Sequence, residues 1–336
     1  MTALRYDFAS DNTAGAAPEA MQALIEANAG AASGYGSDAV TAEAADLVRG
    51  LLDADAEVRF VYSGTAANAI SLAALARPFE AVVAHEHAHV VTDEASAPQA
   101  FGGGLALRTL PGPSAKIDPH WLDTLLRQPE DARFQPPAAL SLTQATEYGA
   151  VYTQVELARL VGLAKQKGLG VHLDGARLAN AVAAGFDPKS LGSLGLDTLV
   201  VGGTKAGMSL TEALVVFDKG LQKRLDLRLR QSGQLASKGR FLSAPWIGML
   251  KSGAWAARAA HANAMARRLA AAIPFPTTHP VEANLVFVAM DDAALQRLRA
   301  AGWAVYRGGD GSARLMCSWA TTPELVDEFA GVLNSL

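Results

Sequence analysis

Residues 171–178 read Val-His-Leu-Asp-Gly-Ala-Arg-Leu, an apolar strand pattern that ends on an acidic residue, Asp174. A carboxylate at the end of a buried strand is costly unless a cation or a strong donor lies beside it, so Asp174 needs a partner. An ordinary ion pair with Arg177 is one candidate. His172 shares a face of the strand with Asp174, since alternate residues point the same way. It either orients Asp174 or is a core histidine with satisfied ring nitrogens.

A second strand end lies downstream. Residues 198–205 read Thr-Leu-Val-Val-Gly-Gly-Thr-Lys, an apolar run followed by a glycine turn and Lys205. A lysine at a strand end is commonly a solvated surface residue. Here the glycines and Thr204 lead to the edge where open α/β sheets bind their ligands. A lysine desolvated there, near other cations, has the lowered pKa that Schiff-base chemistry requires.

A third strand end lies upstream. Residues 61–68 read Val-Tyr-Ser-Gly-Thr-Ala-Ala-Asn, so a strand runs into the start of a helix. Ser63 and Thr65 offer hydroxyls, and Gly64 lets an anion approach the backbone. The free N–H groups of the helix N-terminus suit a phosphate. Taken alone, the segment is better explained as a helix N-cap and nothing more.

The order of the three strand ends resembles the aspartate-aminotransferase-like enzymes that bind pyridoxal 5′-phosphate (PLP). Their pattern is a phosphate turn, then an aspartate, then a lysine. The resemblance implies fold type I of the PLP-dependent transferases, an α/β fold with a mainly parallel sheet and a smaller C-terminal α+β domain. Asp174 would pair with the protonated pyridine nitrogen, which keeps the ring an electron sink.

The rest of the chain fits this fold class. Short apolar runs alternate with helical patterns, which indicates a parallel or mixed sheet covered on both faces. Strands are predicted at residues 57–62, 81–84, 138–142, 170–173, 198–201 and 213–217, and helices at 65–75 and 154–167.

The pattern changes near Ser243. A long helix is predicted at 245–272, strands at 284–289, 303–306 and 313–318, a helix at 292–301, and a last helix from Pro323 with Thr322 as its N-cap. We therefore expect a large domain at 1–242 and a small domain at 243–336.

Composition excludes several classes of protein. The 336 residues carry a net charge of -4 without a dense Lys/Arg run, which argues against nucleic-acid and polybasic membrane partners. The single cysteine, Cys317, excludes an internal disulfide framework. The N-terminus lacks the apolar core of a signal peptide, and no apolar stretch reaches a membrane-spanning length. We expect a cytoplasmic protein that acts on a small molecule.

Four segments resemble the threonine aldolases, in particular the low-specificity L-threonine and L-allo-threonine group of the β-eliminating lyase family. They are Ser-Asp-Asn-Thr at 10–13, Tyr-Gly-Ser-Asp at 35–38, His-Leu-Asp-Gly-Ala-Arg-Leu at 172–178 and Gly-Thr-Lys at 203–205. The resemblance covers nearly the whole chain. It implies PLP-dependent cleavage of β-hydroxy-α-amino acids to glycine and an aldehyde. L-Threonine, L-allo-threonine and phenylserine are candidate substrates.

The resemblance also implies which residues hold the cofactor. Lys205 would bind it covalently, Asp174 would bind its pyridine nitrogen, and His89 would stack on its ring. The remaining cofactor contacts would come from Ser63, Gly64, Thr65, Arg177, Thr204 and Arg230. His85 and His87 alternate with His89 and invite a metal interpretation. No cysteine or second ligand cluster lies nearby, so no metal is expected.

Substrate contacts follow from the same resemblance. Ser10, Arg177 and Arg314 match groups that bind the substrate carboxylate. Arg230 and Tyr35 match residues that serve an active site shared between subunits, which implies a homodimer or homotetramer. For Arg230, a solvated helix face is an equally good interpretation.

One segment departs from the family pattern. Some members have a histidine within the segment that corresponds to 140–149, where this chain offers Gln144, Thr146, Glu147 and Tyr148. Glu147 is expected to contact the substrate. The base that takes the hydroxyl proton stays open between His89, Glu147 and a positioned water.

Other functions share the same cofactor residues. β-Elimination, racemisation and serine hydroxymethyl transfer all use the PLP electron sink, so the cofactor motifs do not separate them. A non-catalytic protein of the PLP fold is a remote alternative, and the presence of both Lys205 and Asp174 argues against it.

Overall fold

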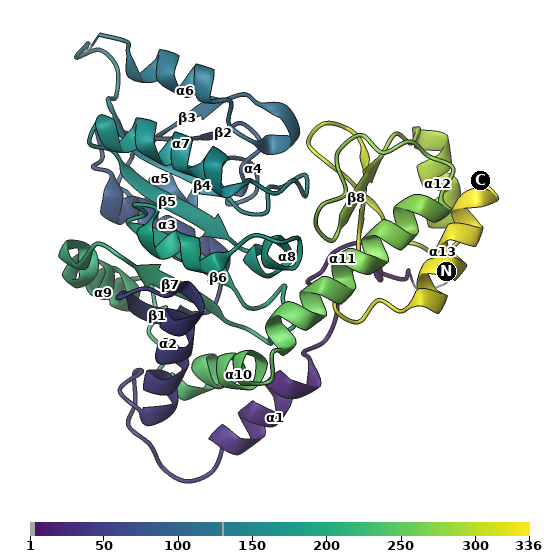
Figure 1. The fold of residues 1–336 in the computed structure, drawn as a ribbon, viewed down its shortest axis with the longest axis horizontal. Coiled ribbons are helices and arrows are strands. Elements are labelled where there is room, and N and C mark those ends of the chain that lie inside the picture. The colour runs from purple at the N-terminus through teal and green to yellow at the C-terminus, as the bar shows by residue number, and fades with distance from the viewer. Residues whose placement is uncertain (1–3, 130) are drawn as a thin grey trace.

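The computed structural model describes residues 4–129 and 131–336. A seven-stranded sheet covered by helices lies beside a three-stranded sheet with helices of its own (Figure 1). The predicted α/β fold with a mainly parallel sheet is thereby confirmed. Within the described ranges, no helix has both the length and the apolar character needed to cross a bilayer.

The large sheet has the strand order β1-β7-β6-β5-β4-β2-β3. Its strands are β1 (Glu57–Val61), β2 (Ala81–His85), β3 (Ala106–Leu110), β4 (Pro137–Thr143), β5 (Gly170–Gly175), β6 (Thr198–Gly202) and β7 (Glu212–Val216). Strand β7 runs antiparallel to β1 and β6, and the other neighbours pair in parallel. Six of these strands were predicted. The exception, β3, is a half-exposed edge strand without a continuous apolar run.

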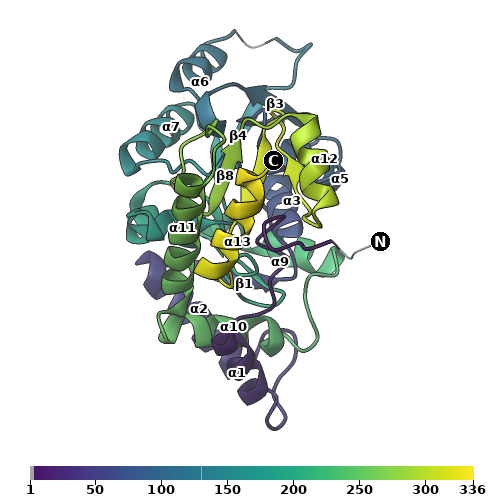
Figure 2. The same cartoon turned by 90° about the vertical axis from the view of Figure 1, so that its right-hand side faces the viewer.

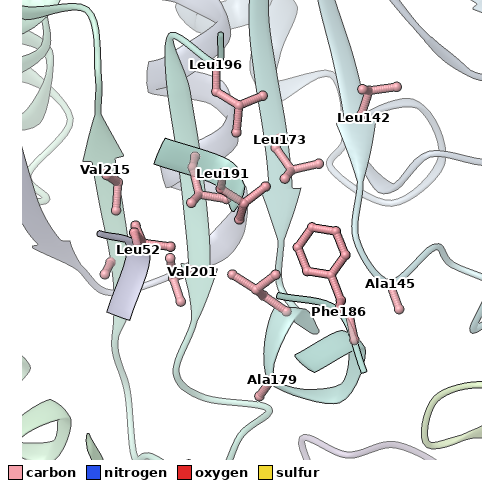
Figure 3. Close-up of a cluster of buried hydrophobic side chains, with 14 of the residues drawn as sticks. Leu52, Leu142, Ala145, Leu173, Ala179, Phe186, Leu191, Leu196, Val201 and Val215 are labelled. Carbon is pink, nitrogen blue, oxygen red and sulfur yellow. The ribbon is translucent and has the colours of Figure 1, made fainter. Parts of the chain in front are cut away.

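Helices cover both faces of this sheet because its central strands are apolar on both sides. On β6, Val200 packs with α3 (Gly64–Leu75) and α9 (Gln222–Gln231). Its neighbour Val201 packs in the opposite core, with residues from α2 (Ala39–Leu52), α7 (Gln154–Gln166) and α8 (Leu178–Ala183). Figure 3 shows part of this second core, where Leu52 and Phe186 lie against strand residues such as Leu173 and Val215.

The large unit contains four further α-helices and three short 3-10 helices. These are α1 (Pro18–Ala27), α4 (His89–Thr92), α5 (Ala97–Phe101), α6 (Pro119–Leu126), η1 (Pro113–Ala115), η2 (Pro188–Ser193) and η3 (Lys219–Leu221).

The smaller sheet is antiparallel, with the order β8-β10-β9. Its elements are β8 (Leu285–Val288), β9 (Tyr306–Arg307), β10 (Ala313–Met316), α11 (Ala254–Ala272), α12 (Asp292–Ala300) and α13 (Pro323–Asn334). Figure 2 shows the three helices around this sheet. The predicted N-cap of α13 is confirmed, since the Thr322 hydroxyl accepts from the backbone N–H of Leu325 at 3.2 Å.

The N-terminal segment lies on this smaller unit, beside α13 (Figures 1 and 2). Phe8 is fully buried and stacks on Phe329, with ring centroids 4.3 Å apart. Beyond this segment, α1 packs against α10 (Arg240–Lys251). The division into domains at 1–242 and 243–336 stays a prediction.

Two expectations about the C-terminal third are wrong. The single helix predicted at 245–272 is two helices, α10 and α11, and Gly253 adopts a left-handed φ of +73° between them. The strand predicted at 303–306 pairs with β10 only at Tyr306 and beyond. Its first half pairs with the N-terminal segment instead, where Arg5 exchanges two 2.8 Å backbone hydrogen bonds with Gly302 and Ala304.

Candidate active site

Three predicted site residues lie at or just beyond the carboxyl ends of adjacent parallel strands. Asp174 lies near the end of β5, Lys205 follows the end of β6, and Glu147 follows the end of β4. Adjacent parallel strands end at one edge of a sheet, so the fold gathers these residues where open α/β sheets bind ligands.

Asp174 is buried, with 4% of its surface exposed. Its Oδ2 accepts from Asn68 Nδ2 at 2.9 Å and its Oδ1 from the Ala176 N–H at 2.9 Å. Burial acts to raise the pKa of this carboxyl, but the charge of Lys205 and the hydrogen bond from the Ala176 N–H outweigh it, so the pKa lies below its usual value. Asp174 is therefore an ionised carboxylate held by neutral hydrogen-bond donors, and it can accept one more cationic partner.

Lys205 follows the glycine turn after β6, and within the described residues its amine makes no hydrogen bond or ion pair. Burial and the nearby Arg177 guanidinium lower the pKa of this amine. The turn is held by Glu212 on β7, whose Oε2 accepts from the Gly203 N–H at 2.7 Å. Burial raises the pKa of Glu212 to about 7. A lysine amine with a lowered pKa and no partner is suited to covalent chemistry.

The predicted phosphate turn forms the N-terminus of α3. The Ser63 hydroxyl caps the helix by accepting from the Ala66 N–H at 3.3 Å. A Cβ added at Gly64 would meet no atom within 4 Å, so the space over this backbone is open. Asn68, one turn further along α3, donates to Asp174 and fixes the turn relative to the end of β5.

Asn68 also joins Asp174 to two groups beyond it. Its Nδ2 donates to Glu94 Oε1 at 2.8 Å, and that same oxygen lies 2.8 Å from Nδ1 of His89. Its Oδ1 lies 3.1 Å from Nε2 of His172. Burial lowers the pKa of His172 to about 4, so this ring is neutral and donates through Nε2. His172 is thus a core histidine that orients Asp174 through Asn68.

The two predicted carboxylate-binding arginines differ in their partners. Arg177 makes a bidentate pair with buried Asp11, at 2.7 and 3.1 Å. Arg314 on β10 donates to the Ala9 carbonyl at 3.3 Å, and its buried Nε has no hydrogen-bond partner among the described residues. Burial and Arg177 lower the pKa of Arg314. Ser10 lies between the residues that these two arginines contact.

The segment 140–149 contains one unsatisfied carboxylate oxygen. Gln144 exchanges two hydrogen bonds with the backbone of Tyr152, and Thr146 donates to the Ser114 carbonyl, so both have structural roles. Glu147 Oε1 accepts from the His89 N–H and the Thr143 hydroxyl, both at 2.9 Å.

The other oxygen of Glu147, Oε2, is buried and has no hydrogen-bond partner among the described residues. Burial raises the pKa of Glu147 to about 7. Burial raises the pKa of the neighbouring Tyr148 to about 12, so that phenol is protonated near neutrality.

Tyr35 and Arg230 contact each other rather than this cluster. The Arg230 guanidinium lies 4.7 Å from the centre of the Tyr35 ring, and both line a cavity of about 890 Å³. Gln234, on the same cavity wall, accepts from the backbone N–H of Tyr62 at 3.0 Å, immediately before the phosphate turn. The cavity wall therefore reaches the residue beside the phosphate turn.

The ring nitrogens of His85 contact backbone groups, Nε2 the Gly112 carbonyl at 3.1 Å and Nδ1 the His87 N–H at 3.0 Å. Across residues 4–129 and 131–336, no group of three or more His, Cys, Asp or Glu side chains is arranged to hold a metal ion.

Sequence analysis missed Asn68, Glu94 and Asp11. Asn68 could have been found, since it lies one helical turn after the phosphate turn. Glu94 stands in the polar run Thr92-Asp93-Glu94, which has no periodicity to indicate that it is buried. Asp11 lies within a quoted motif, but its partner Arg177 is 166 residues away.

These residues fit PLP. Asp174 is a buried carboxylate that lacks a fixed cation, Lys205 has an unpartnered amine, and Gly64 leaves open space at a helix N-terminus. They match the pyridinium, aldehyde and phosphate of PLP in charge and chemistry.

Known proteins resemble this chain over its length. A family model described as β-eliminating lyase matches residues 7–293. A low-specificity L-threonine aldolase of a Pseudomonas species is 43% identical, over 100% of this chain and 99% of that protein. Another low-specificity L-threonine aldolase, of Pseudomonas aeruginosa, is 44% identical, over 98% of this chain and 97% of that protein.

Solved structures also resemble this chain over its length. A threonine aldolase of Leishmania major superposes with a TM-score of 0.92 at 29% identity, over 98% of this chain and 99% of that one. A serine palmitoyltransferase of Sphingomonas wittichii, at 17% identity over 98% and 86% of the two chains, has a TM-score of 0.73 and shares the fold. The architecture is therefore fold type I of the PLP enzymes.

Proposed function

Because the chain belongs to the β-eliminating lyase family, we propose that it is a PLP-dependent aldehyde lyase of the threonine aldolase type. It cleaves the Cα–Cβ bond of β-hydroxy-α-amino acids and releases glycine and an aldehyde. L-Threonine and L-allo-threonine are the proposed substrates, and phenylserine is a further candidate.

The observation that carries this proposal is the unpartnered Lys205 amine beside the ionised, buried Asp174, at the ends of neighbouring strands. A partly buried lysine and a buried aspartate are each costly, and a direct pair between them would satisfy both. Instead, neutral groups hold Asp174, and no group within the described residues holds the Lys205 amine. The two charges are thus kept available for a ligand.

PLP, when bound, accepts the electron pair released as the Cα–Cβ bond breaks. Lys205 would hold it covalently, Asp174 would hold its pyridine nitrogen, and the turn at 63–65 would hold its phosphate. Thr204 and Arg177 are further proposed cofactor contacts, since Thr204 precedes the lysine in the chain and the charge of Arg177 acts on the lysine amine.

Arg314 is proposed to bind the substrate carboxylate, with Ser10 and Arg177 beside it. The support is its buried Nε, which lacks a partner in the described structure. A guanidinium that binds a carboxylate in two places fixes the orientation of the amino acid. Such orientation sets which Cα bond breaks.

Glu147 is the proposed acceptor of the β-hydroxyl proton. Its Oε1 is held by two donors while Oε2 has none, and its pKa of about 7 lets it exchange a proton near neutrality. His89 lies beside it and is the competing candidate.

Tyr35 and Arg230 are proposed to serve the active site of a second subunit in a homodimer or homotetramer. Their support is the 890 Å³ cavity, which they line together and whose lining does not include Lys205, Asp174 or Glu147. The protein is proposed to act in the cytoplasm on a small-molecule amino acid. This proposal rests on its composition, which includes one cysteine, the buried Cys317.

The test compares products from L-threonine, L-allo-threonine, L-serine and phenylserine. We expect equal amounts of glycine and aldehyde, and we expect Lys205→Ala to lose the visible absorbance of bound PLP together with activity. Pyruvate and ammonia would indicate β-elimination, and the D-amino acid would indicate racemisation. A protein that binds PLP but turns over none of these substrates would contradict the proposal.

A further inference from the structure

Glu94 is a buried carboxylate for which the cofactor scheme above gives no role. Its side chain is 0% exposed, and Oε1 receives both His89 Nδ1 and Asn68 Nδ2 at 2.8 Å. Its Oε2 is buried without a partner, and no Lys or Arg pairs with it in the described structure. A carboxylate so placed must either be protonated or share the charge of His89.

The backbone immediately after Glu94 is strained. Ala95 and Ser96 both have left-handed φ values, 47° and 60°, although neither is glycine. Residues with a Cβ adopt this region only at a cost. The strain occurs in the short link between α4 and α5, which carries Glu94 under His89.

His89 is held at two points and open at a third. Its backbone N–H donates to Glu147 Oε1 at 2.9 Å, and its Nδ1 faces Glu94 Oε1. The side chain remains 39% exposed, and within the described residues Nε2 has no hydrogen-bond partner. Glu94 therefore fixes which nitrogen of His89 faces the protein and which faces the ligand.

Asn68 extends the pair to Asp174. One amide nitrogen donates to Glu94 and to Asp174, and neutral His172 fixes the amide by donating to its oxygen. Two carboxylates that share one amide repel each other, so a proton is favoured on the Glu94–His89 side. Asp174 needs its own charge for the pyridine nitrogen.

We propose that Glu94 is a positioning residue that keeps His89 doubly protonated at neutral pH, so that His89 acts as a cation and cannot accept the hydroxyl proton. That proton then passes to Glu147. This last consequence rests on the proposed retro-aldol function, whereas the protonation of His89 does not.

The electrostatic surroundings agree in direction. The hydrogen bond that His89 donates to Glu94 raises the pKa of His89, against burial and the charge of Lys205, and burial raises the pKa of Glu94. The charged groups that face His89 are Glu94, Glu147, Asp174 and Lys205. Because the pKa of His89 is raised, the ring keeps its charge at pH values above the usual pKa of histidine. The charge is lost as the pH rises through the raised pKa.

The direct test measures the ring nitrogens of His89 in the wild-type holoenzyme. Histidine labelled with ¹⁵N would be used, and His89→Asn would assign the signal. We expect the His89 ring of the wild type to carry protons on both nitrogens at pH 7.5. In Glu94→Gln we expect this ring to carry only one proton at the same pH. A wild-type ring with a single proton at this pH would overturn the proposal, whether or not the protein cleaves threonine.

The second test is the pH profile of kcat/KM. Glu94→Gln keeps the shape of the side chain. In this variant the alkaline limb should move about one pH unit lower, so that kcat/KM at high pH falls roughly a further tenfold. The acid limb, assigned to Glu147, should stay in place and should vanish in Glu147→Gln. Glu86→Gln, the same change at an exposed site before α4, is the matched control and should move neither limb. An equal loss at every pH in Glu94→Gln would reduce Glu94 to a structural role and overturn the proposal.

Discussion

Burial and the nearby Arg177 lower the pKa of Arg314, yet of these two arginines only Arg177 pairs with a carboxylate. Asp11 neutralises Arg177 in a buried bidentate pair, so Arg177 is a fixed part of the wall. Arg314 keeps its charge beside this neutral pair. A substrate carboxylate would pair with the Arg314 guanidinium, and the binding energy would be large because the site is already desolvated.

Arg314→Gln should therefore raise KM for L-threonine and lower kcat/KM by roughly 100-fold, about 3 kcal/mol. Steady-state release of aldehyde measures this. Arg307→Gln is the matched control, since Arg307 lies on neighbouring β9, is exposed and pairs with Asp292 on the surface. If Arg314→Gln kept the wild-type KM, the substrate carboxylate would have to bind elsewhere.

Local sequence predicts some site residues and not others, for a physical reason. Lys205 and Asp174 each follow an apolar run, and a charge at the end of a buried strand is visible within a few residues. Glu94 and Asp11 acquire their roles from partners on other elements. The hydrogen bond from Asn284 to Asp11 spans 273 residues, and no local pattern encodes such a contact.

At the scale of elements, the break between α10 and α11 shows where pattern reasoning fails. Residues 245–272 are rich in Ala and Arg, and one glycine in such a run costs only about 1 kcal/mol, so a continuous helix is the natural prediction. The structure bends there because α10 packs against α1 and α2 while α11 packs against α8 and α13. Tertiary packing, which the run itself does not contain, decides the break.

Two glycine substitutions test this explanation. Gly253→Ala should destabilise the protein by about 1 kcal/mol, because its φ of +73° disfavours a side chain although no atom lies within 4 Å. Gly162→Ala is the matched change in the interior of α7, also with open space, and should stabilise by up to about 1 kcal/mol.

Denaturant midpoints at one fixed protein concentration would measure both effects. The same sign for the two variants would contradict the assignment of the break to the conformation of Gly253.

At the scale of the whole molecule, the active-site cluster and the 890 Å³ cavity are separate features of one chain. If Tyr35 and Arg230 serve a neighbouring subunit, each active site takes residues from two chains. Lys205→Ala and Arg230→Ala would then be defects in different halves of one site.

Mixing these two variants under conditions that exchange subunits should restore activity. Half of randomly formed dimers are hybrids, and one site of each hybrid is intact, so recovery should approach roughly a quarter of wild type. Aldehyde release measures the recovery. Mixing Lys205→Ala with Asp174→Asn is the control, since both changes fall in one chain's part of the site and should restore nothing. Failure of the first mixture, with exchange demonstrated, would place Arg230 outside the shared site.

The docking of the N-terminal segment on the C-terminal unit has a consequence for biosynthesis. The backbone N–H of Asp11 contacts the sulfur of Met316, 305 residues later, and Phe8 belongs to the core around Phe329. The ribosome makes Phe8 and Asp11 long before Met316 and Phe329. Until those later residues are made, Arg177 lacks Asp11 in its final place. Each active site is therefore completed only after the C-terminal unit has been synthesised, and cofactor capture follows that synthesis.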